Sequence, residues 1–222
     1  METRAEFHTK LQKIQNEVLA MGSMVEKALL SSVAALKARD LELAQRIITE
    51  DLRVNEKRFE IEEGCIELIA TQQPMASDLR AIISMLAIIT ELERIGDHAE
   101  GIAKIVVMVG DEPPLKPLVD LPRMAEKTAD MLRRSLDALV KRDPEAARKI
   151  AAEDDKVDEL YDQVFRELLS FMAEDPRTIT RATRLIWVGH NLERSADRVT
   201  NICERIVFLV TGKLEEIGVS KY

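Results

Sequence analysis

The sequence has few of the residues that build β-sheets, tight turns and disulfide frameworks. Aromatic residues make up 4 % of the 222 residues, beside 8 glycines, 7 prolines and 2 cysteines. Scarce aromatics disfavour an all-β fold. The cysteines, Cys65 and Cys203, form no motif, so we expect buried free thiols in a reducing compartment rather than a disulfide.

The chain also lacks a positive charge excess and a long apolar segment. It has 32 Lys and Arg against 40 Asp and Glu, a net charge of −8. An acidic chain has no electrostatic footprint for nucleic acid or anionic lipid. No apolar run approaches the roughly 20 residues that span a bilayer, and the first residues lack the apolar stretch of a signal peptide. We therefore expect a cytoplasmic protein with no nucleic-acid partner and no membrane insertion.

Apolar residues recur in steps of three and four along most of the chain, which predicts long helices. Prolines and glycines divide the pattern into six helices, near residues 6–38, 41–71, 76–109, 119–142, 145–173 and 177–212. Most connections are short, so neighbouring helices are antiparallel. The sequence predicts an all-α fold of two tandem antiparallel three-helix bundles, covering residues 1–111 and 119–222 with a linker at 112–118.

The two predicted bundles are copies of each other. In the second helix of each bundle the apolar spacing repeats after an offset of 103 residues, and Asp51 corresponds to Asp154. In the third helix the offset is 100, and Leu92-Glu93-Arg94 corresponds to Leu192-Glu193-Arg194. Because identities and helical spacing agree over two helices, the chain has an internal repeat.

Both copies place carboxylates on faces that a helical bundle would otherwise fill with apolar side chains. An unpaired charge facing a bundle interior costs several kcal/mol, so it needs a partner or an opening to water. Oxygen side chains spaced four residues apart share a helix face. Counting from the turn between helices two and three puts position 51 opposite 95, and 154 opposite 195. The sequence therefore predicts one cluster of oxygen side chains in each copy: Asp51, Asn55, Glu93 and Asp97 in the first, and Asp154, Asp158, Glu193 and Asp197 in the second.

Converging carboxylates are ligands for Mg, Ca, Mn and iron, and they can also hold Zn. The spacing is equally consistent with a hydrated acidic seam neutralised by basic neighbours: Arg53, Arg94, Lys156 and Arg194. His98 follows Asp97, but the second copy has Arg198 there, so we expect a solvated histidine.

The motifs resemble those of the PhoU family over essentially the whole chain. The resemblance rests on Leu92–Ala99, on its copy Leu192–Arg198, on the helix entry Gln73–Arg80 and on the doubled acidic pairs. It implies a cytoplasmic accessory protein of the phosphate ABC transporter. Such a protein would restrain phosphate uptake and phosphate-starvation signalling through contact with the sensor histidine kinase, would not be an enzyme, and would commonly form a homodimer.

The resemblance also implies metal ions, iron or zinc first, with Mn, Mg, Ca and Ni as alternatives. The eight clustered side chains would be the ligands. Since Asn55 stands where a carboxylate is usual, we expect the first site to bind metal more weakly than the second. Position 101 is Gly, where the family pattern usually has the Asn seen at Asn201.

Three other functions stay open at this stage. The chain can serve a different phosphate permease, or act as a helical adaptor that binds no metal. An oxygen-activating di-iron enzyme is disfavoured, because such sites use Glu-x-x-His motifs that neither copy contains.

Overall fold

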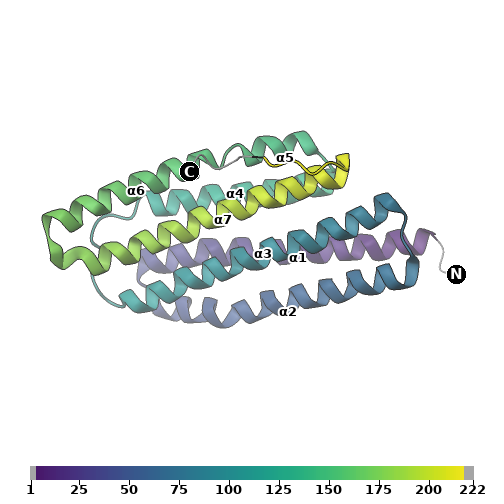
Figure 1. Ribbon diagram of the computed structural model, residues 1–222. Helices are drawn as coiled ribbons and strands as arrows, with labels where there is room; N and C mark the ends of the chain where they lie inside the picture. The colour runs from purple at the N-terminus through teal and green to yellow at the C-terminus, as the bar shows by residue number, and fades with distance from the viewer. Residues whose placement is uncertain (1–3, 218–222) are drawn as a thin grey trace.

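The computed structural model describes residues 4–217, and helices account for nearly all of that range, with no strand in it (Figure 1). The first bundle consists of α1 (Arg4–Ala38), α2 (Leu41–Gln72) and α3 (Ala76–Val109). The second consists of α4 (Asp120–Lys141), α5 (Pro144–Ala151), α6 (Asp155–Glu174), a 3-10 turn at Pro176–Thr178 and α7 (Ile179–Thr211). The predicted all-α fold with an internal repeat is confirmed.

The two bundles lie side by side, with α3 beside α7 and α1 beside α4 (Figure 1). One cluster of buried apolar side chains runs through both of them. The predicted unit boundaries at residues 111 and 119 stay a prediction, and the ends of the predicted units, residues 1–3 and 218–222, lie outside the described residues.

The repeat extends to the first helix of each bundle. Buried positions of α1 from Val18 onward reappear in α4 after the same offset of 103 residues. The match includes a polar detail, because buried Ser32 and Ser135 each donate a hydrogen bond to a backbone carbonyl three residues back, at 2.8 and 2.7 Å. A hydroxyl satisfied within its own helix can be buried at little cost.

Short connections between the first and second helices follow the same chemistry in both copies. Arg39 and Arg142 take the left-handed conformation that ends a helix, with φ of 58° and 50°. Asp40 and Asp143 then cap the next helix, and their carboxylates accept backbone N–H groups three residues on at 2.8 and 2.9 Å. These turns make neighbouring helices antiparallel, as predicted.

The helix predicted over 145–173 is not continuous, and that prediction is wrong. The backbone turns at 152–154, where the amides of Glu153 and Asp154 bond to carbonyls three residues back, at 3.0 and 3.1 Å. No Gly or Pro causes the break. Glu153 is held by cations of α4 at this point, and the acidic run from Glu153 to Asp155 favours a new helix start because carboxylates stabilise the positive N-terminal end of a helix.

One described helix, α1, is long and apolar enough in length and composition to cross a membrane. In this structure it lies against α2, α3 and α4, and its buried side chains belong to the common core.

Candidate functional site

The two predicted clusters lie in matching places between the second and third helices of each bundle. All eight side chains are half-buried, on α2 and α3 in the first copy, and at the start of α6 and on α7 in the second. The register agrees with the prediction within one residue. A Cβ atom on Gly96 would lie 3.3 Å from Asp51 Oδ1, so Asp51 faces this point of α3.

In the first cluster Asp51 is the carboxylate whose ionisation is opposed most strongly. Burial, with repulsion from Glu100 and Asp97, raises its pKa to about 6, although Asn55 Nδ2 donates a hydrogen bond to its carboxylate at 3.1 Å. Burial is also the main reason that the pKa of Asp97 is raised. The first cluster therefore holds a carboxylate that resists ionisation, with an amide as its only side-chain donor among the described residues.

Glu100 is a member of the first cluster that the sequence analysis missed. It lies one turn beyond Asp97, and the spacing of Glu93, Asp97 and Glu100 in steps of four and three was the available signal. Lys104 Nζ binds it at 2.6 Å. The second copy has Thr200 at the matching position, so this extra carboxylate belongs to the first copy alone.

Ionisation of the carboxylates is opposed more strongly in the second cluster than in the first. Burial, with repulsion from Asp158, Asp197 and Glu193, raises the pKa of Asp154 to about 7. Burial, with repulsion from Asp197, raises the pKa of Glu193 to about 7 as well. The pKa values of Asp158 and Asp197 are also raised, burial being the first cause for each. Four neighbouring carboxylates thus oppose one another's ionisation, which favours either protons or a cation among them.

Two oxygens of this cluster are buried without a hydrogen-bond partner, Asp154 Oδ1 and Glu193 Oε2. Asp154 precedes α6, where an aspartate normally caps the helix, but its side chain makes no capping hydrogen bond. His190 Nδ1 lies 3.4 Å from Glu193 Oε2 on the exposed side. Buried oxygens without donors fit a hard metal ion, which would supply the missing positive charge.

Basic neighbours neutralise the clusters only in part. Arg194 donates to Asp197 at 2.6 Å, and Arg94 lies 3.7 Å from both Glu93 and Asp97. Within residues 4–217, Arg53 and Lys156 form no ion pair, although a hydrated acidic seam would use them. As the side chains stand, no three His, Cys, Asp or Glu groups in that range are close enough to share one metal ion. A metal would therefore require these carboxylates to rotate toward each other.

The histidine beside the first cluster is not solvated, contrary to the expectation. His98 is half-buried between α3 and α7, and its Nε2 is buried without a hydrogen-bond partner. Burial, with the nearby charge of Arg198, lowers its pKa to about 4. His98 is therefore a neutral group at the contact between the bundles rather than an exposed one.

The contact between α3 and α7 explains the unusual glycine at position 101. Asn191 of α7 hydrogen-bonds to His98, and its Oδ1 would lie 3.2 Å from a Cβ on Gly101. In the matching place Asn201 Nδ2 donates to Glu91 at 3.1 Å. The residues at positions 91 and 191 correspond in the repeat, and each contacts the opposite helix. A side chain at position 101 would crowd Asn191.

A family model described as the PhoU domain matches the chain twice, over residues 18–106 and 121–206. The phosphate-specific transport system accessory protein PhoU homolog of Clostridium acetobutylicum is 40 % identical over 217 residues, 97 % of this chain and 99 % of that protein. The accessory protein PhoU of Escherichia coli is 38 % identical over 208 residues, 94 % of this chain and 86 % of that protein.

Two crystal structures have closely similar folds. PhoU from Pseudomonas aeruginosa superposes with a TM-score of 0.89 at 36 % identity, over 93 % of this chain and 100 % of that one. The phosphate transport system regulatory protein PhoU from Streptococcus pneumoniae superposes with a TM-score of 0.88 at 32 % identity, over 94 % of this chain and 99 % of that one. Both similarities span nearly the full length of the described fold.

Proposed function

The chain belongs to the PhoU family, which gives it a role in phosphate transport, and we propose that it is a metal-binding negative regulator of phosphate homeostasis. In this proposal it restrains uptake by the phosphate ABC transporter and the two-component response to phosphate starvation. Its partners are the transporter and the sensor histidine kinase at the cytoplasmic face, and it acts as a cytoplasmic homodimer without catalysis of its own.

The names of the relatives support the first part of the proposal. The proteins from Clostridium acetobutylicum and Escherichia coli are accessory proteins of the phosphate-specific transport system, and the one from Streptococcus pneumoniae is a regulatory protein. An accessory or regulatory protein acts through contacts with its partners, and a chain of exposed helices offers surfaces for such contacts. The net charge of −8 argues against direct binding to nucleic acid.

The observation that carries metal binding is the pair of buried oxygens that make no hydrogen bond, Asp154 Oδ1 and Glu193 Oε2, among four carboxylates whose pKa values are all raised. The residues that would hold the metal are Asp154, Asp158, Glu193 and Asp197, and in the first copy Asp51, Asn55, Glu93 and Asp97. Iron or zinc is proposed first, with Mn, Mg, Ca and Ni as alternatives. A bound ion would supply positive charge that links two helices, so that its loss or gain alters the surface that partners meet.

Removing the gene tests the regulatory role. A deletion strain grown in phosphate-rich medium is expected to raise a phosphate-starvation promoter reporter several-fold, because the restraint on the kinase is lost. The plasmid-borne parent gene should restore low output, and an empty plasmid should not. Reporter output that stays at the parental level in the deletion strain would refute the proposed regulation.

Converting the first copy to the chemistry of the second tests the metal assignment there. Asn55→Asp is expected to strengthen metal binding by the first site at least about tenfold, because it replaces the amide that bonds to Asp51 with a carboxylate like Asp158. The measurement is a metal titration in an Asp154→Asn/Glu193→Gln background, which isolates the first site.

Asn16→Asp is the matched control, because it adds the same charge at an exposed position of α1. The control should leave the affinity unchanged. Equal affinities for the parent, the Asn55→Asp variant and the control would show that position 55 is not a ligand position.

A further inference from the structure

The first bundle contains a cavity between two of its helices. It measures about 290 Å³ and lies between α1 and α2, reaching inward as far as Asp51 and Gly96. Its wall on α1 is formed by Met24, Ala28 and Ser31 with one cation, Lys27, and its wall on α2 carries Arg46, Glu50 and Arg53.

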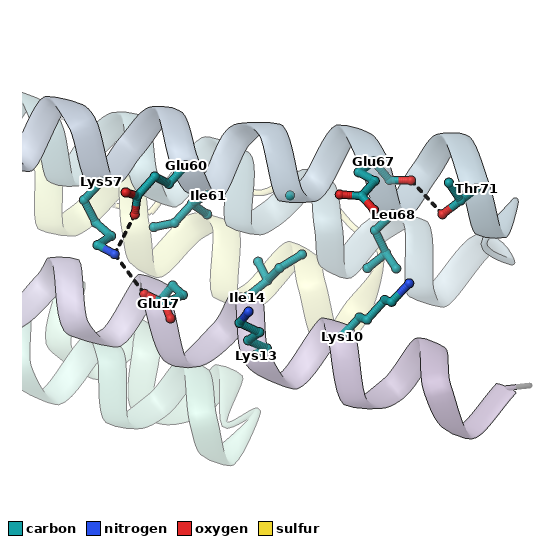
Figure 2. Close-up of a pocket in the computed structure, with 11 residues that line it drawn as sticks. Lys10, Lys13, Ile14, Glu17, Lys57, Glu60, Ile61, Glu67, Leu68 and Thr71 are labelled. Carbon is teal, nitrogen blue, oxygen red and sulfur yellow. Dashed lines mark hydrogen bonds and ion pairs between the residues drawn. The ribbon is translucent and has the colours of Figure 1, made fainter. Parts of the chain in front are cut away.

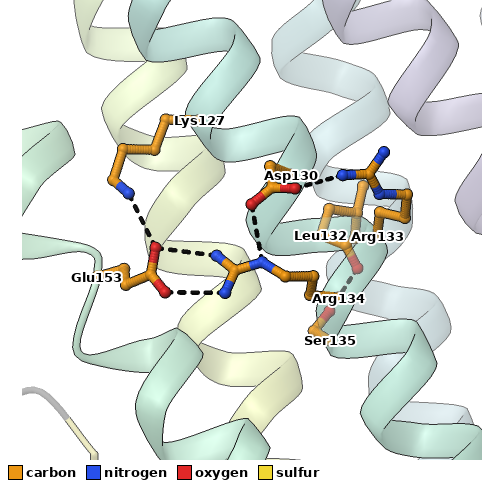
Figure 3. Close-up of polar contacts among 7 residues, drawn as sticks. All are labelled: Lys127, Asp130, Leu132, Arg133, Arg134, Ser135 and Glu153. Carbon is orange, nitrogen blue, oxygen red and sulfur yellow. Dashed lines mark hydrogen bonds and ion pairs between the residues drawn. The ribbon is translucent and has the colours of Figure 1, made fainter.

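The repeat shows why the cavity exists. With the offset of 103 residues, Ser31 corresponds to Arg134, Ala28 to Met131 and Met24 to Lys127. In the second bundle Arg134 donates two hydrogen bonds of 2.9 Å to Glu153, and Lys127 donates a third of 2.9 Å (Figure 3). Met131 is fully buried there.

The first bundle has the glutamate of this network but not its cations. Glu50 corresponds to Glu153, and the α1 positions that would hold it are occupied by Met24 and Ser31. Space that side chains fill in the second bundle is therefore open in the first, on the same helix faces.

Three cations that line the cavity have no charged or hydrogen-bonding partner among the described residues. Lys27, Arg46 and Arg53 line it, and none of them forms an ion pair or hydrogen bond with another described residue. A larger cavity of about 420 Å³ lies further along the α1–α2 groove, and there Lys13 also forms no ion pair or hydrogen bond with another described residue, whereas Lys57 is paired (Figure 2). There Lys57 is held by Glu17 and Glu60, at 3.0 and 2.7 Å.

The balance of charge around the smaller cavity favours an anion. Its lining has three exposed cations and two carboxylates, Glu50, which is also exposed, and Asp51, which is half-buried. Guanidinium groups bind tetrahedral oxyanions through two parallel N–H donors, and a lysine adds a point charge. The Ser31 hydroxyl on the opposite wall can donate one more hydrogen bond.

We propose that the cavity between α1 and α2 binds a phosphate group, held by Lys27, Arg46 and Arg53 with Ser31. The choice of phosphate among tetrahedral oxyanions rests on the proposed function. The group is either free inorganic phosphate or the end of a small phosphate ester. A phosphate bound here lies beside Asp51, so occupancy of the cavity and of the first acidic cluster are coupled.

Titration calorimetry on chelator-treated, full-length protein at low salt tests this directly, with inorganic phosphate, sulfate and glycerol phosphate added in separate experiments. The expected result is one phosphate site per chain. Arg46→Gln/Arg53→Gln should weaken binding at least about tenfold, since two charge-assisted contacts are lost. Met24→Lys/Ser31→Arg should abolish it, because these side chains fill the cavity and pair with Glu50 as their counterparts pair with Glu153.

The repeat supplies the matched control. Lys149→Gln/Lys156→Gln removes the cations at the positions that correspond to Arg46 and Arg53, and it should leave phosphate binding unchanged. Binding of inorganic phosphate or of glycerol phosphate more tightly than sulfate supports the site. Whichever of the two phosphates binds more tightly identifies the kind of ligand that the site takes. No binding of either phosphate by the parent, sulfate binding as tightly as phosphate, or equal weakening by the control variant would overturn the proposal. The titration needs no transporter or kinase, so its failure is distinct from failure of the reporter experiment.

Discussion

Protein carrying Asp154→Asn and Glu193→Gln is expected to lose the metal of the second bundle, with affinity there reduced at least about a hundredfold. Each of these two carboxylates has a buried oxygen that makes no hydrogen bond, so the variant removes the groups with the strongest need for a cation. The amides keep nearly the same shape, so the helices should pack as before. Elemental analysis of protein purified without chelator, followed by metal titration, measures the loss.

The control for this variant is Glu159→Gln/Glu174→Gln, which removes the same charge from exposed positions of α6. It should retain the metal content of the parent. If the site variant and the parent carry equal metal, the second cluster is not a metal centre, and the hydrated acidic seam becomes the better description.

The same variant is expected to be more stable than the metal-free parent at pH 8, and equally stable at pH 4. The folded-state pKa values of Asp154 and Glu193 are about 7, above the ordinary 3.8 and 4.5. Between about pH 4 and pH 7 the native parent therefore binds more protons than the unfolded chain, and its free energy of unfolding falls as pH rises. The variant lacks these two groups and escapes that loss.

The expected difference at pH 8 is about 2 kcal/mol, after discounting for the partial exposure of both side chains. This corresponds to a rise in Tm of roughly 4 to 8 °C. Comparing variant with parent at each pH cancels the titration of His98, whose lowered pKa has the opposite effect over part of this range. The measurement is urea unfolding of chelator-treated protein at pH 4 and pH 8.

The exposed pair Glu159→Gln/Glu174→Gln again serves as the control and should change little at either pH. A site variant that is no more stable than the parent at pH 8 would mean that solvent screens these carboxylates in the native protein. Together the two measurements test whether the cluster lowers the stability of the metal-free protein in order to bind a cation. In that case the same double variant would abolish metal binding and raise the stability of the metal-free protein.

Much of the arrangement of the site could be predicted from the sequence by helical geometry. The steps of three and four placed Asp51 on an inward face, and the short turn at Gln73 set which residue of α3 lies opposite. Gly96 proved to be that residue, one position from the expected 95. The estimate was close because the rise per residue of a helix is fixed, so distance from a short turn converts directly into height along the hairpin.

Contacts between elements that are distant in the chain could not be predicted from helical geometry. The break before α6 coincides with the binding of Glu153 by Lys127 and Arg134 of α4, and no Gly or Pro marks it in the sequence. His98 was expected in solvent because nothing local indicated that Asn191 would lie against it. Each of these features depends on which helix faces overlap, and the hydrophobic pattern of one helix does not specify its neighbour.

By itself the sequence determined the all-helical fold, the doubled unit and the heights at which acidic side chains meet, because backbone hydrogen bonding imposes one period on every helix. Only the tertiary structure decided which carboxylate oxygens lack donors, where α5 ends and where α1 and α2 leave a cavity. These properties depend on the volume and charge of side chains that lie far apart in the chain and meet only after the bundles have packed. The matching positions Ser31 and Arg134 illustrate the difference, since equivalent places in the repeat become an opening in one bundle and an ion-pair network in the other.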